Sequence, residues 1–375
     1  MLTRRALVTL ASAALTGGVL TAASLPAQAS PPSDTASAAH GPTHAPAAHH
    51  TGYDWRITPT GSTEEFRGLA AVDRRTAWVS GEAGTVLRTT DGGATWQDVS
   101  PSAAVGLALR DIEAADATHA VALSIGPGSD SRIYRTTDGG QTWSETFRNA
   151  DPAAFYDCIA FSKDGTALAM SDPAHGYLQI ARSSDAGRTW QVMDTSGMPA
   201  AGTNEFGFAA SGTCLVSGPG HRFWFATGGD QPRVFSTTDA GQRWSARPVP
   251  IRSGDTAGVY SIAFRDARHG VVVGGDFLDE TNGADAAAWT ADGGRTWKSS
   301  SEQVDGYRSG VDFLPRTARG VVAVGPTGSD VSHDGGRTWA HFDNDRYDGV
   351  QCSHDGACWA SGTDGRVAVL ERPRS

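Results

Sequence analysis

The chain has 375 residues, and its 31 Lys and Arg against 41 Asp and Glu give a formal net charge of -10 at pH 7. This acidic balance argues against nucleic acid or an anionic membrane surface as the partner. Beyond the N-terminus, no apolar stretch approaches the ~20 residues that a membrane-spanning helix needs.

The N-terminal residues have the composition of an export signal followed by a linker. Arg4 and Arg5 precede an apolar run that ends near Leu25, and Ala27-Gln-Ala29 is a small-residue cleavage site. The arginine pair partly matches a twin-arginine signal. We therefore expect residues 1–29 to be a signal peptide, residues 30–51 to be a disordered Pro-, Ala-, Ser- and His-rich linker, and the mature protein to be secreted.

Six copies of a short motif divide the rest of the chain. Each reads Ser/Thr-x-Asp-x-Gly-x-x-Trp, as in residues 290–297 (TADGGRTW), and five of the six have Thr before the Trp. Asp and Gly favour a tight turn, and the Ser/Thr hydroxyl can bond local backbone amides. We assign a structural role to the motif aspartates, which are Asp91, Asp138, Asp185, Asp239, Asp292 and Asp334.

The motif spacing predicts a β-propeller. Successive motif aspartates are 47, 47, 54, 53 and 42 residues apart, which is the length of a four-stranded blade. After Trp339 the chain has three more expected strands and no further motif, whereas residues 53–57 (YDWRI) imitate the strand that follows a motif. We therefore predict an all-β domain at residues 52–375, a seven-bladed propeller in which an N-terminal strand completes the last blade. Six blades and an unattached segment are the alternative.

The four cysteines predict two disulfides in an exported protein. Three connectivities are open from the count alone. Cys352 and Cys358 lie close enough to close a hairpin, which would leave Cys158 to pair with Cys214. No Cys-x-x-Cys occurs, so thiol redox catalysis has no support.

The motifs resemble the Asp-box (BNR) repeat of sialidases, sortilin-type receptors and xyloglucan hydrolases, where the box lies away from the active site. The blade pattern is also similar to the seven-bladed photosystem II stability and assembly factor family and its secreted bacterial relatives. The first blade shows this pattern in residues 66–69 (FRGL), 78–84 (WVSGEAG) and 89–96 (TTDGGATW). The resemblance implies a propeller that binds a client through an arginine-rich patch.

The starts of the inner strands are the expected functional positions, because the loops at that end of a propeller form its binding face. Alignment of the blades pairs an often aromatic residue with an often charged one, and alternation would direct the charged member into a central funnel. The candidate ligand-binding residues are Arg67, Arg110, Asp157, Glu205, Tyr260, Tyr307, Arg308 and Asp348. Mutual neutralisation of these charges around a water-filled channel is the alternative interpretation.

A second regularity is an acid in the turn after each second strand. These acids are Glu82, Asp130, Asp172, Asp230, Asp276, Asp330 and Asp364. One interpretation is that these acids stabilise Asx-type turns. The alternative hypothesis is an acidic rim that attracts a basic partner or a cation.

These residues favour a non-catalytic binding protein over an enzyme. We expect an unidentified peptide, protein or small polar ligand as partner, a monomeric protein, and neither metal nor cofactor. The alternative is a glycoside hydrolase with Asp157 and Glu205 as its carboxylate pair, although the Phe/Tyr-Arg-Ile-Pro start of sialidases is absent. Some similar proteins are labelled oxidoreductases, but no dinucleotide, haem or flavin motif supports that activity here.

Overall fold

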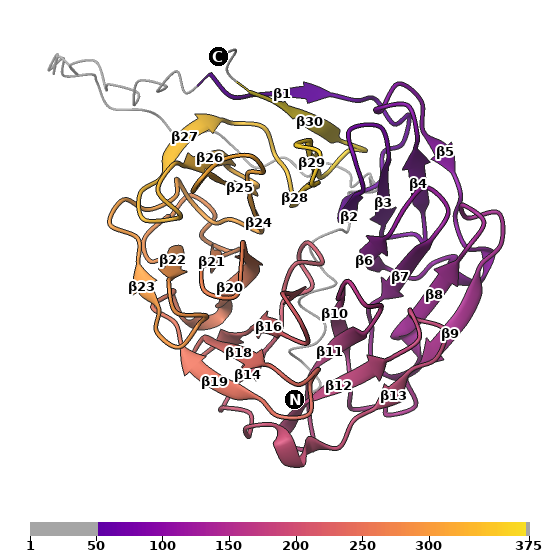
Figure 1. The fold of residues 1–375 in the computed structure, drawn as a ribbon, viewed down its shortest axis with the longest axis horizontal. Helices are drawn as coiled ribbons and strands as arrows, with labels where there is room; N and C mark the ends of the chain where they lie inside the picture. The colour runs from indigo at the N-terminus through magenta and orange to yellow at the C-terminus, as the bar shows by residue number, and fades with distance from the viewer. Residues whose placement is uncertain (1–51, 373–375) are drawn as a thin grey trace, which may run out of the picture. The chain divides into compact units, whose positions relative to one another are not determined.

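The computed structural model describes residues 52–372, which form a ring of seven β-sheets around a central axis (Figure 1). The predicted all-β, seven-bladed propeller is therefore confirmed. The expected signal peptide and linker lie outside the described residues. Among residues 52–372, no helix is long and apolar enough to cross a membrane.

The first three blades are regular four-stranded antiparallel meanders. Blade 1 contains β2 (Phe66–Ala71), β3 (Ala77–Gly81), β4 (Val86–Thr89) and β5 (Gln97–Asp98). Blade 2 contains β6 (Leu109–Ala114), β7 (Ala120–Ser124), β8 (Arg132–Thr136) and β9 (Ser144–Arg148). Blade 3 contains β10 (Tyr156–Phe161), β11 (Ala167–Ala174), β12 (Tyr177–Ser183) and β13 (Gln191–Val192).

The middle blades carry an insertion. Blade 4 contains β15 (Leu215–Ser217), β16 (Phe223–Ala226), β18 (Arg233–Thr237) and β19 (Ser245–Pro248). Blade 5 contains β20 (Gly254–Phe264), β21 (Gly270–Asp276), β22 (Ala287–Thr290) and β23 (Lys298–Ser299). The inserted strands β14 (Glu205–Phe206) and β17 (Gly228–Gly229) extend the sheet of blade 5 beyond its inner strand.

The last two blades complete the ring. Blade 6 contains β24 (Gly310–Phe313), β25 (Val321–Gly325), β26 (Gly328–Ser332) and β27 (Ala340–Asp343). Blade 7 contains β28 (Gly349–Cys352), β29 (Cys358–Ser361), β30 (Val367–Glu371) and, as its outer strand, β1 (Asp54–Ile57). The described loops also contain the 3-10 turns η2 (Ser102–Ala104), η3 (Gly128–Asp130) and η4 (Thr195–Gly197).

Strand β1 closes the ring by pairing with β30. The two strands are antiparallel, with Trp55 opposite Leu370, and the Trp55 indole N–H donates to Ser329 Oγ at 3.0 Å. Trp55 is only 6% exposed. The N-terminal strand therefore covers the edge that β30 would otherwise expose, and the predicted closure is confirmed.

The Asp-box aspartates fasten the turn between the third and fourth strands. Asp292 shows the pattern: its carboxylate accepts from the hydroxyls of Thr290 and Thr296, at 2.9 and 2.6 Å, and from the Thr296 amide at 3.0 Å. Asp239 keeps its bonds to the Thr237 hydroxyl and the amide of residue 243, where Arg243 offers no threonine hydroxyl. The boxes are therefore turn motifs held by local hydrogen bonds.

Aromatic rings fill the interfaces between blades. Trp78, Trp224 and Trp359, in the second strands, are at most 1% exposed. Trp96 of blade 1 meets Trp359 of blade 7 edge to face at 6.1 Å, and Trp143 meets Trp78 in the same way at 6.4 Å. Such pairs stabilise each blade against the preceding one.

Polar groups cap the inner edges that face the central channel. Asp111 Oδ2 of blade 2 accepts from the Ile159 amide of blade 3 at 2.6 Å. Asp312 Oδ2 of blade 6 accepts from the Cys352 amide of blade 7 at 2.7 Å. Unpaired edge amides are costly, so these acids give the channel a structural lining that the sequence pattern did not reveal.

Both predicted disulfides are present. Cys352–Cys358 closes the β28–β29 hairpin, and Cys158–Cys214 joins blade 3 to the start of blade 4. The described residues contain no free cysteine.

Candidate functional site

The funnel end is built on β-bulges at the starts of the inner strands. In β2 the pairing shifts between Phe66 and Gly68, which leaves Arg67 as the extra residue. The same shift singles out Arg110 in β6, Asp157 in β10 and Tyr260 in β20. A bulge redirects a side chain out of the regular alternation, so these residues occupy equivalent positions around the axis.

Arg67 is the centre of a charged network at this end. Its guanidinium contacts Glu65 at 2.7 Å and Asp348 at 3.4 Å, and Nη1 donates to the Ala210 carbonyl at 3.3 Å. Burial opposes the charge, but the nearby Asp348 and Glu65 carboxylates outweigh it and raise the pKa of Arg67. Arg67 therefore stays cationic.

Arg110 lies beside this network and shares an acid with it. Its Nη2 is 2.5 Å from Glu82 Oε1, which also lies 4.0 Å from Arg67 Nε, and its Nη1 donates to the Ala209 carbonyl at 3.3 Å. Burial, with the adjacent Arg67 charge, lowers the pKa of Arg110 to about 10. Burial also raises the pKa of Asp348 to about 6, against the attraction of Arg67.

The charges of this cluster largely neutralise one another. Two arginines face three carboxylates, those of Glu65, Glu82 and Asp348. The cluster therefore carries no excess of positive charge for binding an anionic ligand.

Residues 207–212, which we call the plug, cross the funnel between β14 and β15. The plug contacts Arg67 and Arg110 through its carbonyls, and the Gly207 amide donates to Asp172 Oδ1 at 2.7 Å. On the opposite side of the ring, Ser211 Oγ donates to the Ser309 carbonyl at 2.6 Å. In Figure 1 the chain after β14 reaches the centre of the ring.

An aromatic seat holds the plug. The Phe208 ring stacks on Tyr260 with centroids 3.8 Å apart, and Tyr307 meets Tyr260 edge to face at 4.6 Å. Phe208 is 8% exposed. The ring also lies against Gly228, where any side chain would collide with it. The predicted funnel residue Tyr260 therefore contacts a segment of its own chain, and Tyr307 packs against Tyr260.

The predicted position of Glu205 is wrong. The alignment put it at the start of the inner strand of blade 4, but that strand is β15, and Glu205 lies in the inserted β14. Its carboxylate accepts from Arg233 Nε at 2.8 Å, from Thr227 Oγ1 at 2.7 Å and from the Gly202 amide at 2.7 Å. The insertion before blade 4 shifted the alignment.

Both carboxylates proposed for glycoside hydrolysis are buried in this structure. The Glu205 side chain is 1% exposed and ion-paired with Arg233. Asp157 is 2% exposed, and Gly207 of the plug packs against its carboxylate. A hydrolase needs one carboxyl to donate a proton and one to meet water or sugar, and in the plugged structure neither group is open to a substrate.

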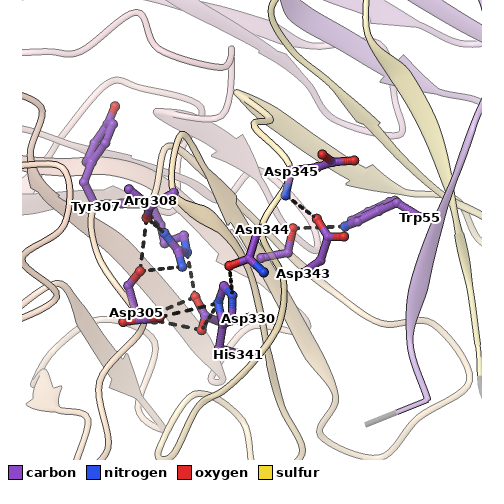
Figure 2. Close-up of polar contacts among 11 residues, drawn as sticks. Trp55, Asp305, Tyr307, Arg308, Asp330, His341, Asp343, Asn344 and Asp345 are labelled. Atoms are coloured by element: carbon purple, nitrogen blue, oxygen red, sulfur yellow. Dashed lines mark hydrogen bonds and ion pairs between the residues drawn. The ribbon is translucent and has the colours of Figure 1, made fainter. Parts of the chain in front are cut away.

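The predicted position of Arg308 is also wrong. Ser309 donates its amide to Val324, as Asp348 does to Ser361, so Ser309 is the counterpart of Asp348 and Arg308 is displaced by one residue. Arg308 is fully buried, and its Nε donates to Asp330 Oδ2 at 2.6 Å. Figure 2 shows the Tyr307 ring pointing away from this cluster.

His341 completes the buried cluster of blade 6. Its Nδ1 lies 3.6 Å from Asp330 Oδ1, and its Nε2 is 3.0 Å from Asn344 Oδ1 (Figure 2). The interaction with Asp330 raises the pKa of His341 against the effect of partial burial. Asp330 is 1% exposed, so it does not belong to the acidic rim proposed from the sequence.

Three of the other rim acids have separate local roles. Glu82 binds Arg110, Asp172 binds the plug, and Asp276 accepts from Thr256 Oγ1 at 2.7 Å. Within residues 52–372, no group of three or more His, Cys, Asp or Glu side chains is arranged to hold a metal ion.

Sequence reasoning missed the plug. The interval from Trp190 to Leu215 is 25 residues, whereas the equivalent interval from Trp96 to Ile112 is 16. This length difference is the signal that could have revealed an insertion. The contacts that place it in the funnel depend on residues distant in sequence.

The fold and the boxes define a seven-bladed Asp-box propeller with a plugged, charge-balanced funnel. Residues 48–302 match the family model of the photosynthesis system II assembly factor YCF48, and the chain belongs to this family. A search of curated proteins returns no match.

Solved structures share the fold at low sequence identity. YCF48 bound to a D1 peptide is 17% identical with a TM-score of 0.59, over 84% of this chain and 94% of that one. YCF48 from Cyanidioschyzon merolae is 17% identical with a TM-score of 0.55, over 86% and 99%. The GH74 xyloglucanase from Xanthomonas campestris is 17% identical with a TM-score of 0.57, over 84% of this chain and 53% of that one.

Proposed function

We propose that this protein is an exported, non-catalytic propeller that binds a peptide segment of a client protein on its funnel face. The observation that carries the proposal is that Arg67 and Arg110 donate to main-chain carbonyls, those of Ala210 and Ala209. Side chains that bind carbonyls recognise peptide backbone irrespective of sequence. One YCF48 structure is described as bound to a D1 peptide, which supports the same class of partner.

Exposed apolar side chains on the funnel face support protein binding there. Val105 is 79% exposed in the loop between β5 and β6, and Leu278 is 69% exposed in the loop between β21 and β22. Both loops belong to the end where inner strands begin. A partner that covered these side chains would remove their apolar surface from water, which favours binding.

The test compares two apolar-to-acid substitutions in the complete exported protein. Leu278→Asp should reduce client capture in a crosslinking pull-down from the producing cells at least tenfold, because it places a charge in the contact. Val192→Asp is the matched control, since Val192 is 50% exposed on the outer strand β13. Equal capture by both variants and the wild type would contradict a funnel-face site.

A further inference from the structure

The plug makes the contacts that a bound peptide would make. Arg67 and Arg110 bind its carbonyls, Asp172 binds the Gly207 amide, and the Phe208 ring occupies an aromatic seat. Backbone hydrogen bonds with one anchored side chain are a recurring mode of peptide recognition. The contacts of the plug therefore indicate the kind of ligand that fits the funnel.

The contacts between the plug and the arginines leave donors unused. Both carbonyl contacts are 3.3 Å long, near the upper limit for an N–H···O bond. The Nε–H groups of Arg67 and Arg110 are buried and make no hydrogen bond among the described residues, although Glu82 Oε1 lies 4.0 Å from Arg67 Nε. A buried donor without an acceptor costs free energy, so a ligand that satisfied these groups would bind better than the plug.

The charge of the site restricts the ligand. The two arginines are outnumbered by the carboxylates of Glu65, Glu82 and Asp348. A carboxylate or phosphate would meet more negative than positive charge, whereas a peptide carbonyl needs only an N–H donor. These contacts favour a neutral peptide over an acidic sugar.

The aromatic seat limits which side chains a bound peptide can place against Tyr260. Phe208 stacks on Tyr260 and lies against the Gly228 backbone, and the following Ala209 and Ala210 bring their carbonyls close to the arginines. A ring fits this seat, and small residues after it allow the main chain to approach. The preferred segment is therefore an aromatic residue followed by two small ones.

We propose that the plug is an internal stand-in for the client, and that the client displaces it with a neutral aromatic-small-small segment. This inference rests on the proposed function. The two tethers of the plug remain in place during the exchange: the pairing of β14 with β17 on one side and the Cys158–Cys214 disulfide on the other.

The experiment uses a capped synthetic peptide with the plug sequence of residues 207–212 (GFAASG) as the probe, and the complete exported protein. Phe208→Asp should drive the plug from its seat, because it would place a charged group against the Tyr260 ring and the Gly228 backbone, where no partner for it is present among the described residues. We expect this variant to bind the peptide at least tenfold more tightly than the wild type. A peptide with Ala in place of Phe should lose at least tenfold in affinity, and adding Tyr260→Ala to the variant should abolish binding.

Hydrogen exchange on the wild-type protein gives a second measurement that does not depend on the variant folding. Saturating peptide should accelerate exchange at the Gly207 amide, which is bonded to Asp172 in the plugged state. Unchanged exchange at Gly207 with peptide bound elsewhere would overturn the inference, as would a folded Phe208→Asp protein with wild-type affinity. If Leu278→Asp still reduces client capture at least tenfold in that case, the proposed function stands and only the displacement mechanism fails.

Discussion

At the scale of single residues, the position of a charge within its strand decides whether it serves stability or binding. Arg67 and Arg308 both follow an aromatic residue near the start of an inner strand. In blade 6 the strand begins one residue later relative to this pair. The Arg308 side chain therefore points into the blade and pairs with Asp330, whereas the Arg67 side chain lies in the funnel. Arg308 is therefore a structural residue.

The Arg308–Asp330 pair gives a stability prediction. Asp330→Asn should lower the free energy of unfolding by about 3–5 kcal/mol, because it leaves a buried guanidinium without its counter-ion. Denaturant unfolding measures the effect. Glu371→Gln is the matched control, since its exposed pair with Arg56 at 3.4 Å should contribute less than about 1 kcal/mol. A loss below about 1 kcal/mol for Asp330→Asn would show that the pair is not needed.

At the scale of elements, a strand from the far end of the chain completes the last blade. Strand β1 pairs with β30 over four residues, and Trp55 enters the core between blades 6 and 7. The Asp boxes hold the other outer strands through turn hydrogen bonds. Blade 7 lacks a box, so its outer strand depends on pairing and on Trp55.

Trp55→Ala tests the closure. Loss of a buried tryptophan should lower the free energy of unfolding by about 3–5 kcal/mol, and exchange at the β30 amides should increase. Ile57→Ala on the same strand should change stability by less than about 1 kcal/mol, because Ile57 is 43% exposed. Similar stability of the two variants would mean that β1 does not seal the ring.

At the scale of the whole molecule, two sets of acids make stability depend on pH in opposite directions. Hydrogen bonds from Thr95 lower the pKa of Asp91 to about 2, and the corresponding bonds outweigh burial to lower that of Asp292 to about 2. In and around the channel, burial raises the pKa of Glu113 to about 8 and of Asp312 to about 7.

The direction in which stability changes with pH depends on whether the folded or the unfolded chain binds more protons. Box aspartates stabilise the fold above their unfolded pKa of about 4, and this stabilisation is lost as pH falls towards 2. The folded channel acids hold protons that the unfolded chain has released, so stability falls as pH rises from about 4 to 8. We expect maximal stability near pH 4–5. Urea unfolding across pH 3–9 measures it, and Glu113→Gln should reduce the decline above pH 5. A rise in stability from pH 5 to 8 would contradict this assignment.

The sequence by itself determined the architecture of this protein, because the Asp boxes recur at blade length and each motif forms its turn through local hydrogen bonds. The seven blades, the closing strand Tyr53–Ile57 and both disulfides followed from spacing and composition. The alignment of the blades also placed Arg67, Arg110 and Asp348 at inner-strand starts, and the structure brings the three side chains into one ion-paired cluster.

Only the tertiary structure decided what the funnel contains. A one-residue shift reverses the direction of a strand side chain, which is why the sequence pattern misplaced Arg308. Because of the insertion before β15, Glu205 lies in β14 and not in the inner strand of blade 4, and the Phe208 ring stacks on Tyr260. These contacts join residues from different blades, and no local pattern in the sequence encodes a contact across the axis of the ring.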